Sequence, residues 1–217
     1  MAEAKIELVN HEAELVSWFP LGMPCSTFIT GTAKVCTAKV EEMNSGSFEE
    51  HRAFVRKLMQ WGHYSPMEFV DLTFYLTTSR AVANELVRHR MASYMQESQR
   101  FVKYDNGLQV IMPATVKDTL EDALWREQVS DAYDTYLFLL EKGHKPEDAR
   151  TVLPMATATR MLCKMNLREF RHFICLRTAP AAWSEMRILA NLMAEAFAKQ
   201  FPDEVYLISD VWHREGE

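Results

Sequence analysis

One short stretch of the sequence, residues 88–100, concentrates side chains that bind anions. It contains Arg88-His89-Arg90, two serines and Arg100, and the span from 80 to 100 holds four arginines and no lysine. Arginine is suited to bidentate binding of phosphate, which serine hydroxyls can complete. The flanking arginines should also keep His89 neutral, because a nearby positive charge disfavours its protonation. These residue types predict a site for a small anionic ligand.

A purely structural interpretation of the same stretch is also open. Cations at the C-terminal end of a helix interact favourably with its dipole. Glu85 precedes Arg88 by three residues, a spacing that allows an ion pair on a helix. The triplet alone favours this structural interpretation, and a ligand site gains support only from other segments.

Three further segments combine histidine or arginine with polar neighbours. They are residues 62–68 (GHYSPME), 149–154 (ARTVLP) and 166–178 (NLREFRHFICLRT). In the last of them, Arg168 and His172 are four residues apart and would share one face of a helix. Taken singly, each segment could be a solvated surface or a helix end.

Several common fingerprints of cofactor and metal sites are absent from the sequence. There is no G-x-G-x-x-G, no P-loop, no H-E-x-x-H and no G-x-S-x-G. The four cysteines form no C-x-x-C pair and are expected to be reduced core thiols, so no metal site is expected. Any phosphate must therefore be held by side chains. The net charge of −6 argues against a protein that coats nucleic acid.

The elements that must position these segments show both strand and helix patterns. Strands are predicted over 5–9, 12–19, 69–78 and 155–164. Helices are predicted over 26–39, 80–92, 117–142, 146–152, 167–177 and 182–200, and after Pro202. A capping box of Ser47 and Glu50 begins another helix, which Gly62 ends. The polar stretch 93–108 is predicted to be one long loop.

These elements indicate an α+β fold with one sheet packed by several helices. The 217 residues, 48% apolar and 25% charged, suit a single domain, 1–217, with a buried core. No stretch of about 18 apolar residues occurs, so a membrane span is not expected. The N-terminal residues lack the basic and apolar regions of a secretory signal, so the expected location is the cytoplasm.

Taken together, the four segments resemble the flavin-dependent thymidylate synthases, the ThyX family. The signature of that family is R-H-R, seven residues and then serine, here Arg88-His89-Arg90 and Ser98. The other segments occur in the same order as in the family. G-H-x-[ST]-P-x-E comes before the signature, and A-R-x-V-L-P and then N-x-R with a later L-R-T come after it. The resemblance covers about residues 5–205. The other thymidylate synthase class uses a cysteine in a Pro-Cys-His context, which Pro24-Cys25-Ser26 matches only superficially.

The resemblance implies a homotetramer with a mostly antiparallel sheet and active sites built between subunits. It implies FAD as cofactor, NADPH as the reductant of FAD, and methylenetetrahydrofolate as the donor of one carbon to C5 of the uracil. The reduced flavin would supply hydride, so the protein would position and polarise the reactants. His63 would flank the folate pocket. The residues implied to contact FAD are Ser65, Glu68, Arg88, His89, Arg90, Asn166, Arg168 and His172.

The remaining matches are implied to lie on the nucleotide side. Arg177 would bind a uracil carbonyl and stabilise negative charge on the ring. Ser98 is the second catalytic candidate, as a binding hydroxyl rather than a nucleophile. Arg150 would reach the nucleotide phosphate from a neighbouring subunit. The residues implied to bind the nucleotide are Glu85, Arg88, Gln96, Ser98, Arg100, Arg150 and Arg177.

Three departures from the family pattern fall on the nucleotide or folate side. Glu85 stands where glutamine is usual, Met95-Gln96 where Asn-Glu is usual, and residues 181–185 replace a more polar run. Gln96 could donate to or accept from a 2′-hydroxyl, whereas a carboxylate only accepts. We therefore hypothesise that UMP, alone or beside dUMP, is a substrate, as for the UMP methylase of polyoxin-type nucleoside antibiotic pathways. The alternative is dUMP alone, the substrate of an ordinary thymidylate synthase.

Two other functions compete with this hypothesis. A degenerate family member could bind flavin or nucleotide without turnover. The changes at Met95 and Ala181 favour that function, and the retained arginines oppose it. Methylation of uridine within RNA would need a polyanion-binding track, which a net charge of −6 without lysine-rich runs does not provide.

Overall fold

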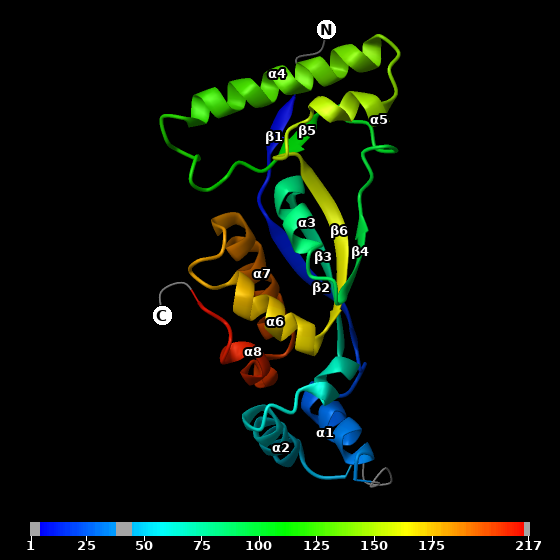
Figure 1. Ribbon diagram of the computed structural model, residues 1–217, viewed down its shortest axis with the longest axis vertical. Coiled ribbons are helices and arrows are strands. Elements are labelled where there is room, and N and C mark those ends of the chain that lie inside the picture. Colours follow the sequence, from blue (N-terminus) through cyan, green and yellow to red (C-terminus); the bar gives the residue numbers. More distant parts are fainter. Residues whose placement is uncertain (1–4, 38–44, 215–217) are drawn as a thin grey trace.

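An antiparallel sheet forms the centre of the molecule (Figure 1). The computed structural model describes residues 5–37 and 45–214, and within them the sheet is ordered β2 (Glu12–Phe19), β3 (Asp71–Ser79), β6 (Ala158–Asn166), β4 (Ala92–Gln96). A separate parallel pair joins β1 (Ile6–Leu8) to β5 (Leu108–Val110). The expected α+β class with a mostly antiparallel sheet is confirmed, and the parallel pair is an addition to it.

β4 shows that the prediction of one long loop over residues 93–108 was wrong. Only residues 97–107 form the loop, because 92–96 pair with β6 and 108–110 pair with β1. Tyr94 is the only aromatic or β-branched residue of β4, so the local sequence carries little strand signal. Pairing with β6 therefore decides this strand.

The two faces of the sheet differ in burial, because side chains alternate along each strand. Phe74 on β3 lies opposite Cys163 on β6, and both are fully buried. Tyr75 lies opposite Leu162, and they are 40% and 41% exposed. On β4, Met95 is 72% exposed. One face therefore carries the core, while the other presents apolar side chains to solvent.

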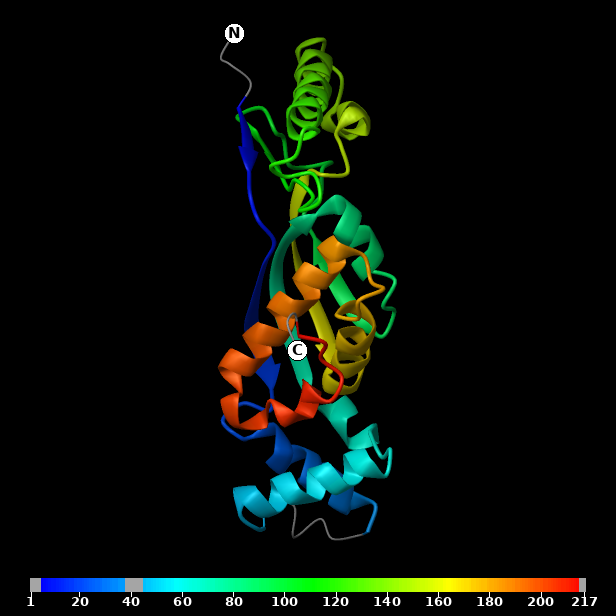
Figure 2. The same cartoon turned by 90° about the vertical axis from the view of Figure 1, so that its left-hand side faces the viewer.

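Helices cover the buried face of the sheet (Figure 2). They are α3 (Arg80–Leu86), α6 (Leu167–Arg177), α7 (Ser184–Gln200) and the short α8 (Tyr206–Ser209). Phe170 and Phe173 of α6 join the same core as Phe74 of the sheet. The helices predicted over 167–177 and 182–200 are confirmed, whereas α3 is shorter than the predicted 80–92.

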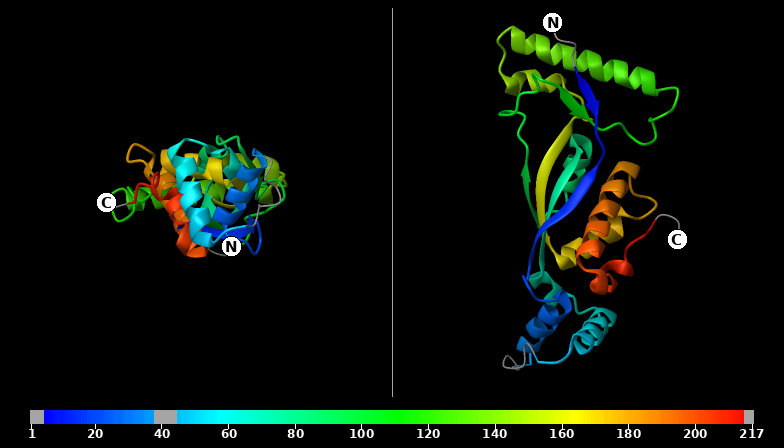
Figure 3. Two further views of the ribbon diagram at one scale, coloured as in Figure 1. Left: turned by 90° about the horizontal axis from the view of Figure 1, so that it is seen from below. Right: turned by 180° about the vertical axis from the view of Figure 1, so that it is seen from behind.

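Further helices extend the molecule at both ends of the sheet (Figure 3). At one end, α4 (Asp122–Glu141), α5 (Pro146–Ala149) and the 3₁₀ turn η3 (Arg150–Val152) form a second core with β1 and β5. At the other end lie α1 (Cys25–Val35), α2 (Phe48–Gln60) and the 3₁₀ turn η2 (Ser65–Phe69). Residues 38 and 39 of the helix predicted over 26–39 lie outside the described residues. Across the described ranges, no helix is long and apolar enough to cross a membrane.

The two ends of α2 determine where the segment after it lies. Ser47 and Glu50 form the expected capping box. At the other end, Gly62 has a φ of +72°, and the backbone N–H of His63 donates to the Leu58 carbonyl at 2.8 Å. This is a Schellman motif, in which glycine avoids the strain that a Cβ would bring. It turns the chain directly into η2.

α1 is capped by a residue from the other end of the chain. Its N-cap position is Pro24, which makes no side-chain capping bond. The buried Glu204, in the 3₁₀ turn η4 (Pro202–Glu204), accepts instead from the backbone N–H groups of Cys25 at 2.8 Å and Ser26 at 2.5 Å, and from the Ser26 hydroxyl. A carboxylate there satisfies unpaired N–H groups and interacts favourably with the helix dipole.

We expect Glu204→Ala to lower the free energy of unfolding by about 2–4 kcal/mol, because buried donors lose a charged acceptor. Urea denaturation followed by circular dichroism measures the change. The matched control is Asp203→Ala at the exposed neighbouring position, which should shift the free energy of unfolding by less than about 0.5 kcal/mol. Equal effects of the two substitutions would contradict the capping role.

Candidate active site

The turn after α3 brings the Arg-His-Arg segment next to the end of α6. Arg177 is the last residue of α6, and the triplet lies between α3 and β4. The Tyr94 hydroxyl donates to the backbone carbonyl of His89 at 2.8 Å, which holds the turn against the sheet. As a result His89 is buried, whereas Arg88 and Arg90 are exposed.

A chain of hydrogen bonds joins four side chains at this point. Arg177 donates from Nε to Nε2 of His89 at 2.9 Å, and from Nη1 to a carboxylate oxygen of Glu85. On the other side of the ring, His89 Nδ1 lies 3.1 Å from Oε1 of Glu169. Glu85 therefore pairs with Arg177, and the ion pair with Arg88 that the sequence spacing allows does not form.

The environment of His89 favours its neutral form. Burial is the largest cause that lowers the pKa of His89. The hydrogen bond to Glu169 opposes this shift in pKa, and the Arg177 charge adds to it. The expectation of a neutral histidine thus agrees with the structure. Its physical cause differs, because burial and Arg177 act here rather than the flanking Arg88 and Arg90.

A cavity of about 440 Å³ lies beside these hydrogen-bonded side chains, where α6, η2 and the turn after α3 meet. Arg168 and Glu68 form an ion pair there. The Asn166 side chain caps α6, because its oxygen accepts from the backbone N–H of Glu169 at 2.9 Å. The volume lies in the range of small-molecule sites. The residues that line the cavity are Glu68, Met91, Asn166, Arg168, Glu169 and His172.

The remaining residues expected on the flavin or folate side are close in sequence to residues that line this cavity. Arg88 and Arg90 precede Met91, and neither forms a side-chain hydrogen bond or ion pair with another described residue. Unpaired guanidinium groups are available to a phosphate. Ser65 begins η2, and His63 is exposed, with its ring centroid 5.9 Å from that of Trp61.

Three residues expected at the nucleotide phosphate lie beyond the C-terminal end of β4. Arg100 forms an ion pair with Glu147 of α5 at 3.1 Å. Arg150 donates from Nε to the Glu147 backbone carbonyl at 3.2 Å. Ser98 accepts the backbone N–H of Arg100 at 3.3 Å. Glu147, which sequence analysis did not single out, thus holds both arginines in one place.

The expected site residues therefore form two groups within one chain. The first group surrounds Arg177 and His89, and the second surrounds Glu147. The five residues of β4, which extend about 13 Å, lie between them. Gln96, at the end of β4, donates from Nε2 to the Thr159 hydroxyl of β6 at 3.3 Å. Within one chain, the two groups therefore lie at opposite ends of β4.

Glu169 lies between His89 and the cavity, although no functional motif in the sequence pointed to it. A structural signal was present, because Glu169 is the third residue of α6 and Asn166 is the N-cap. An acidic residue at that position is typical of a helix start. The local pattern therefore explains why an acidic residue stands at this position. It does not reveal the contact with His89, which is 80 positions away.

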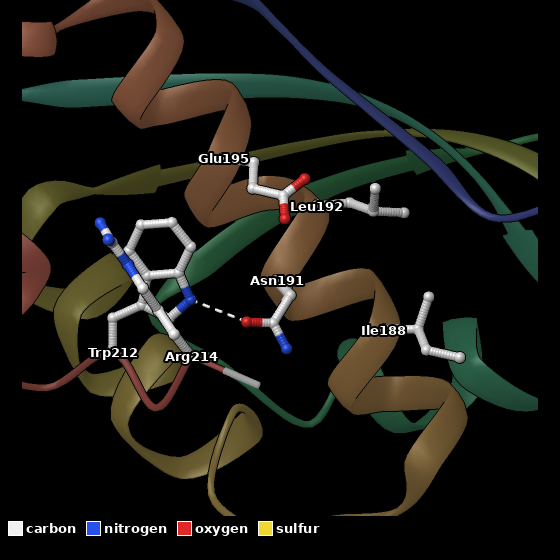
Figure 4. A pocket seen from close by; sticks show the side chains of 6 residues that line it. All are labelled: Ile188, Asn191, Leu192, Glu195, Trp212 and Arg214. Carbon is white, nitrogen blue, oxygen red and sulfur yellow. Dashed lines mark hydrogen bonds between the residues drawn. The ribbon is translucent and has the colours of Figure 1, made fainter. Parts of the chain in front are cut away.

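A larger cavity, of about 550 Å³, contains none of the expected residues (Figure 4). It lies between α7 and the C-terminal tail. The Trp212 indole N–H donates to Asn191 at 2.7 Å, and the Arg214 guanidinium lies 4.2 Å from the centre of the Trp212 ring. The expected residues gather instead at the cavity beside α6, so that cavity is the better candidate for chemistry.

Cys25 is placed unsuitably for a nucleophile. It is fully buried at the start of α1, and burial raises the pKa of its thiol. A thiol in that state has little of the thiolate needed for attack. Cys163 is also buried, Cys175 is half-buried and Cys36 is exposed, so the expectation of core thiols was wrong for Cys36.

Comparisons with known proteins place the chain beside a defined group of relatives. The family described as thymidylate synthase complementing protein matches residues 24–203. The flavin-dependent thymidylate synthase of Geobacter sulfurreducens is 39% identical over 164 residues, which cover 73% of this chain and 71% of the relative. That of Pyrococcus furiosus is 31% identical over 204 residues, covering 90% and 80%. The solved structure of a UMP/dUMP methylase, PolB from Streptomyces cacaoi bound with 5-Br dUMP, has a TM-score of 0.82 at 25% identity, covering 94% of this chain and 97% of that one.

Proposed function

The chain belongs to the flavin-dependent thymidylate synthase family and is a flavin-dependent methyltransferase, and from this we propose that it methylates C5 of uracil in both dUMP and UMP. In this proposal FAD is the cofactor, NADPH is the reductant and methylenetetrahydrofolate is the carbon donor.

The group of Arg177, His89 and Glu85 beside the α6 cavity carries this proposal. Arg177 uses two of its N–H groups within the chain and keeps others for a ligand. A guanidinium that donates to a uracil carbonyl stabilises negative charge as it develops on the ring. No protein nucleophile is needed, which agrees with the buried Cys25.

The residues around the α6 cavity fit a flavin dinucleotide. Asn166, Arg168 and His172 offer hydrogen-bonding groups in the cavity, and Arg88 and Arg90, which have no partner among the described residues, suit a diphosphate. The bound flavin supplies the hydride that completes the methyl group. In the proposal Ser65 and Glu68 support the cofactor from η2, and His63 flanks the folate.

We place the complete site between subunits of a homotetramer. Support comes from the two separate groups at opposite ends of β4, since one mononucleotide must contact both the uracil site at Arg177 and the phosphate site at Ser98, Arg100 and Arg150. The uncovered sheet face, with Met95 exposed, leaves apolar surface for such an assembly.

Gln96 supports the acceptance of both sugars. Its amide N–H donates to Thr159, which leaves the amide oxygen as an acceptor. A 2′-hydroxyl can donate to that oxygen, and a deoxyribose makes no demand on it. The similar PolB is described as a UMP/dUMP methylase.

Tritium release from C5-labelled nucleotide tests this function. We expect release from both dUMP and UMP, and loss of release when FAD, NADPH or methylenetetrahydrofolate is omitted. Release from dUMP alone would remove UMP from the proposal. Release from neither nucleotide, with FAD still bound, would favour the competing function of a degenerate member that binds without turnover.

A further inference from the structure

We propose that Glu169 is a positioning residue that orients Arg177 by selecting one tautomer of His89. The inference rests on the proposed function only in its effect on turnover. The hydrogen-bonded chain itself is a property of the folded protein.

The tautomer of His89 follows from the donors and acceptors that contact its two ring nitrogens. The Arg177 Nε always carries a proton, so Nε2 of His89, 2.9 Å away, must be the acceptor. A neutral imidazole then has its only proton on Nδ1. That N–H donates to the Glu169 carboxylate at 3.1 Å. In the other tautomer two N–H groups would face each other, and the carboxylate would face a ring lone pair.

Burial makes this choice strict. The His89 side chain is 5% exposed and that of Glu169 is 12% exposed, so water competes poorly for either group. The Phe173 ring lies edge-on to His89, with centroids 5.1 Å apart. Tyr94 holds the backbone of His89, but only Glu169 and Arg177 contact the ring nitrogens among the described residues. The carboxylate at Nδ1 and the Arg177 donor at Nε2 therefore favour the same tautomer, and without Glu169 the Nδ1 proton loses its acceptor.

The choice of tautomer also affects Arg177, on the other side of the His89 ring from Glu169. His89 holds its Nε, and Glu85 holds its Nη1 and compensates its charge. A guanidinium whose charge is compensated in this way suits an uncharged carbonyl, whereas Arg88 and Arg90, which have no ion-pair partner among the described residues, suit phosphate. Losing the Glu169 acceptor would release the ring, and Arg177 would lose one of the two contacts that orient it.

Nitrogen NMR of the holoenzyme, labelled with ¹⁵N at histidine, tests the proposal without turnover. The signals of His89 are identified by their loss in His89→Gln. We expect Nδ1 of the wild type to be protonated and Nε2 to be bare at neutral pH. Glu169→Leu should give a mixture of tautomers or the opposite one. Glu169→Gln should restore the wild-type tautomer, because its amide oxygen still accepts.

Kinetics of the same variants supply the second readout. We expect kcat of Glu169→Leu to fall about 10–100-fold, with Glu169→Gln recovering most of the loss. Glu195→Leu, at an exposed position on α7, is the matched control and should change neither readout. A proton on Nε2 of wild-type His89, or a wild-type tautomer and kcat in Glu169→Leu, would overturn the inference. If neither nucleotide is methylated, the proposed function fails, while the ring-nitrogen signals still decide the inference.

Discussion

Replacing Arg177 with alanine should lower kcat for methylation by about 10²–10³-fold, because a preorganised donor to the reacting ring is lost. The Arg177 guanidinium is already oriented by Glu85 and His89 before any ligand binds. Its contribution should therefore appear mainly in the transition state, with a smaller change in nucleotide KM. Steady-state tritium release with saturating cofactor and folate measures both parameters.

Arg177→Lys separates charge from geometry in this prediction. Lysine keeps the positive charge but lacks the planar pair of donors. It should therefore recover little of the lost kcat. The matched control is Arg126→Ala, an exposed arginine of α4 that pairs with Asp122, and it should leave kcat unchanged. A kcat for Arg177→Ala within about threefold of the wild type would remove Arg177 from the catalytic role.

Mixing two inactive variants should restore activity if each site is shared between subunits. Arg150→Ala should weaken nucleotide binding while FAD stays bound, and Arg177→Ala should lack turnover. In mixed assemblies some sites receive intact Arg150 from one chain and intact Arg177 from another. Random mixing should recover about a quarter of the wild-type activity per site. Co-expression with two affinity tags, followed by the tritium assay, measures the recovery.

The control for this experiment uses two residues of one group. Arg177 and His89 contact each other within one chain at 2.9 Å. A mixture of Arg177→Ala and His89→Gln should therefore recover no activity, since no site can contain both intact residues. Absence of recovery in the Arg150 mixture as well would mean that each site is complete in one chain. Loss of FAD from Arg150→Ala would mean that this residue belongs to the flavin side.

Local signals in the sequence were sufficient for most helices of the site. α6 was expected over 167–177 and is observed over Leu167–Arg177, because Asn166 caps its start. Gly62 ends the helix before η2 through its positive φ, as expected. Such boundaries depend on residues within one turn of each other, and they can therefore be read without the tertiary structure.

Contacts between distant segments could not be read in the same way. β4 exists because it pairs with β6, although its own residues carry little strand signal. The start of α1 is capped by Glu204, which is 179 positions from Cys25. A sequence pattern indicates which groups need a partner, but the packing of the chain determines which partner is nearby.

The same distinction applies to the candidate site. The sequence by itself determined which side chains are available for chemistry, since the types and spacing of Arg88, His89 and Arg90 predict an anion site and the family resemblance implies a flavin and a nucleotide there. Only the tertiary structure decided that Glu85 pairs with Arg177, that Glu169 contacts His89, and that the residues around Glu147 lie at the other end of β4. The physical reason is that hydrogen bonds act over about 3 Å, whereas their partners are many tens of residues apart in the chain.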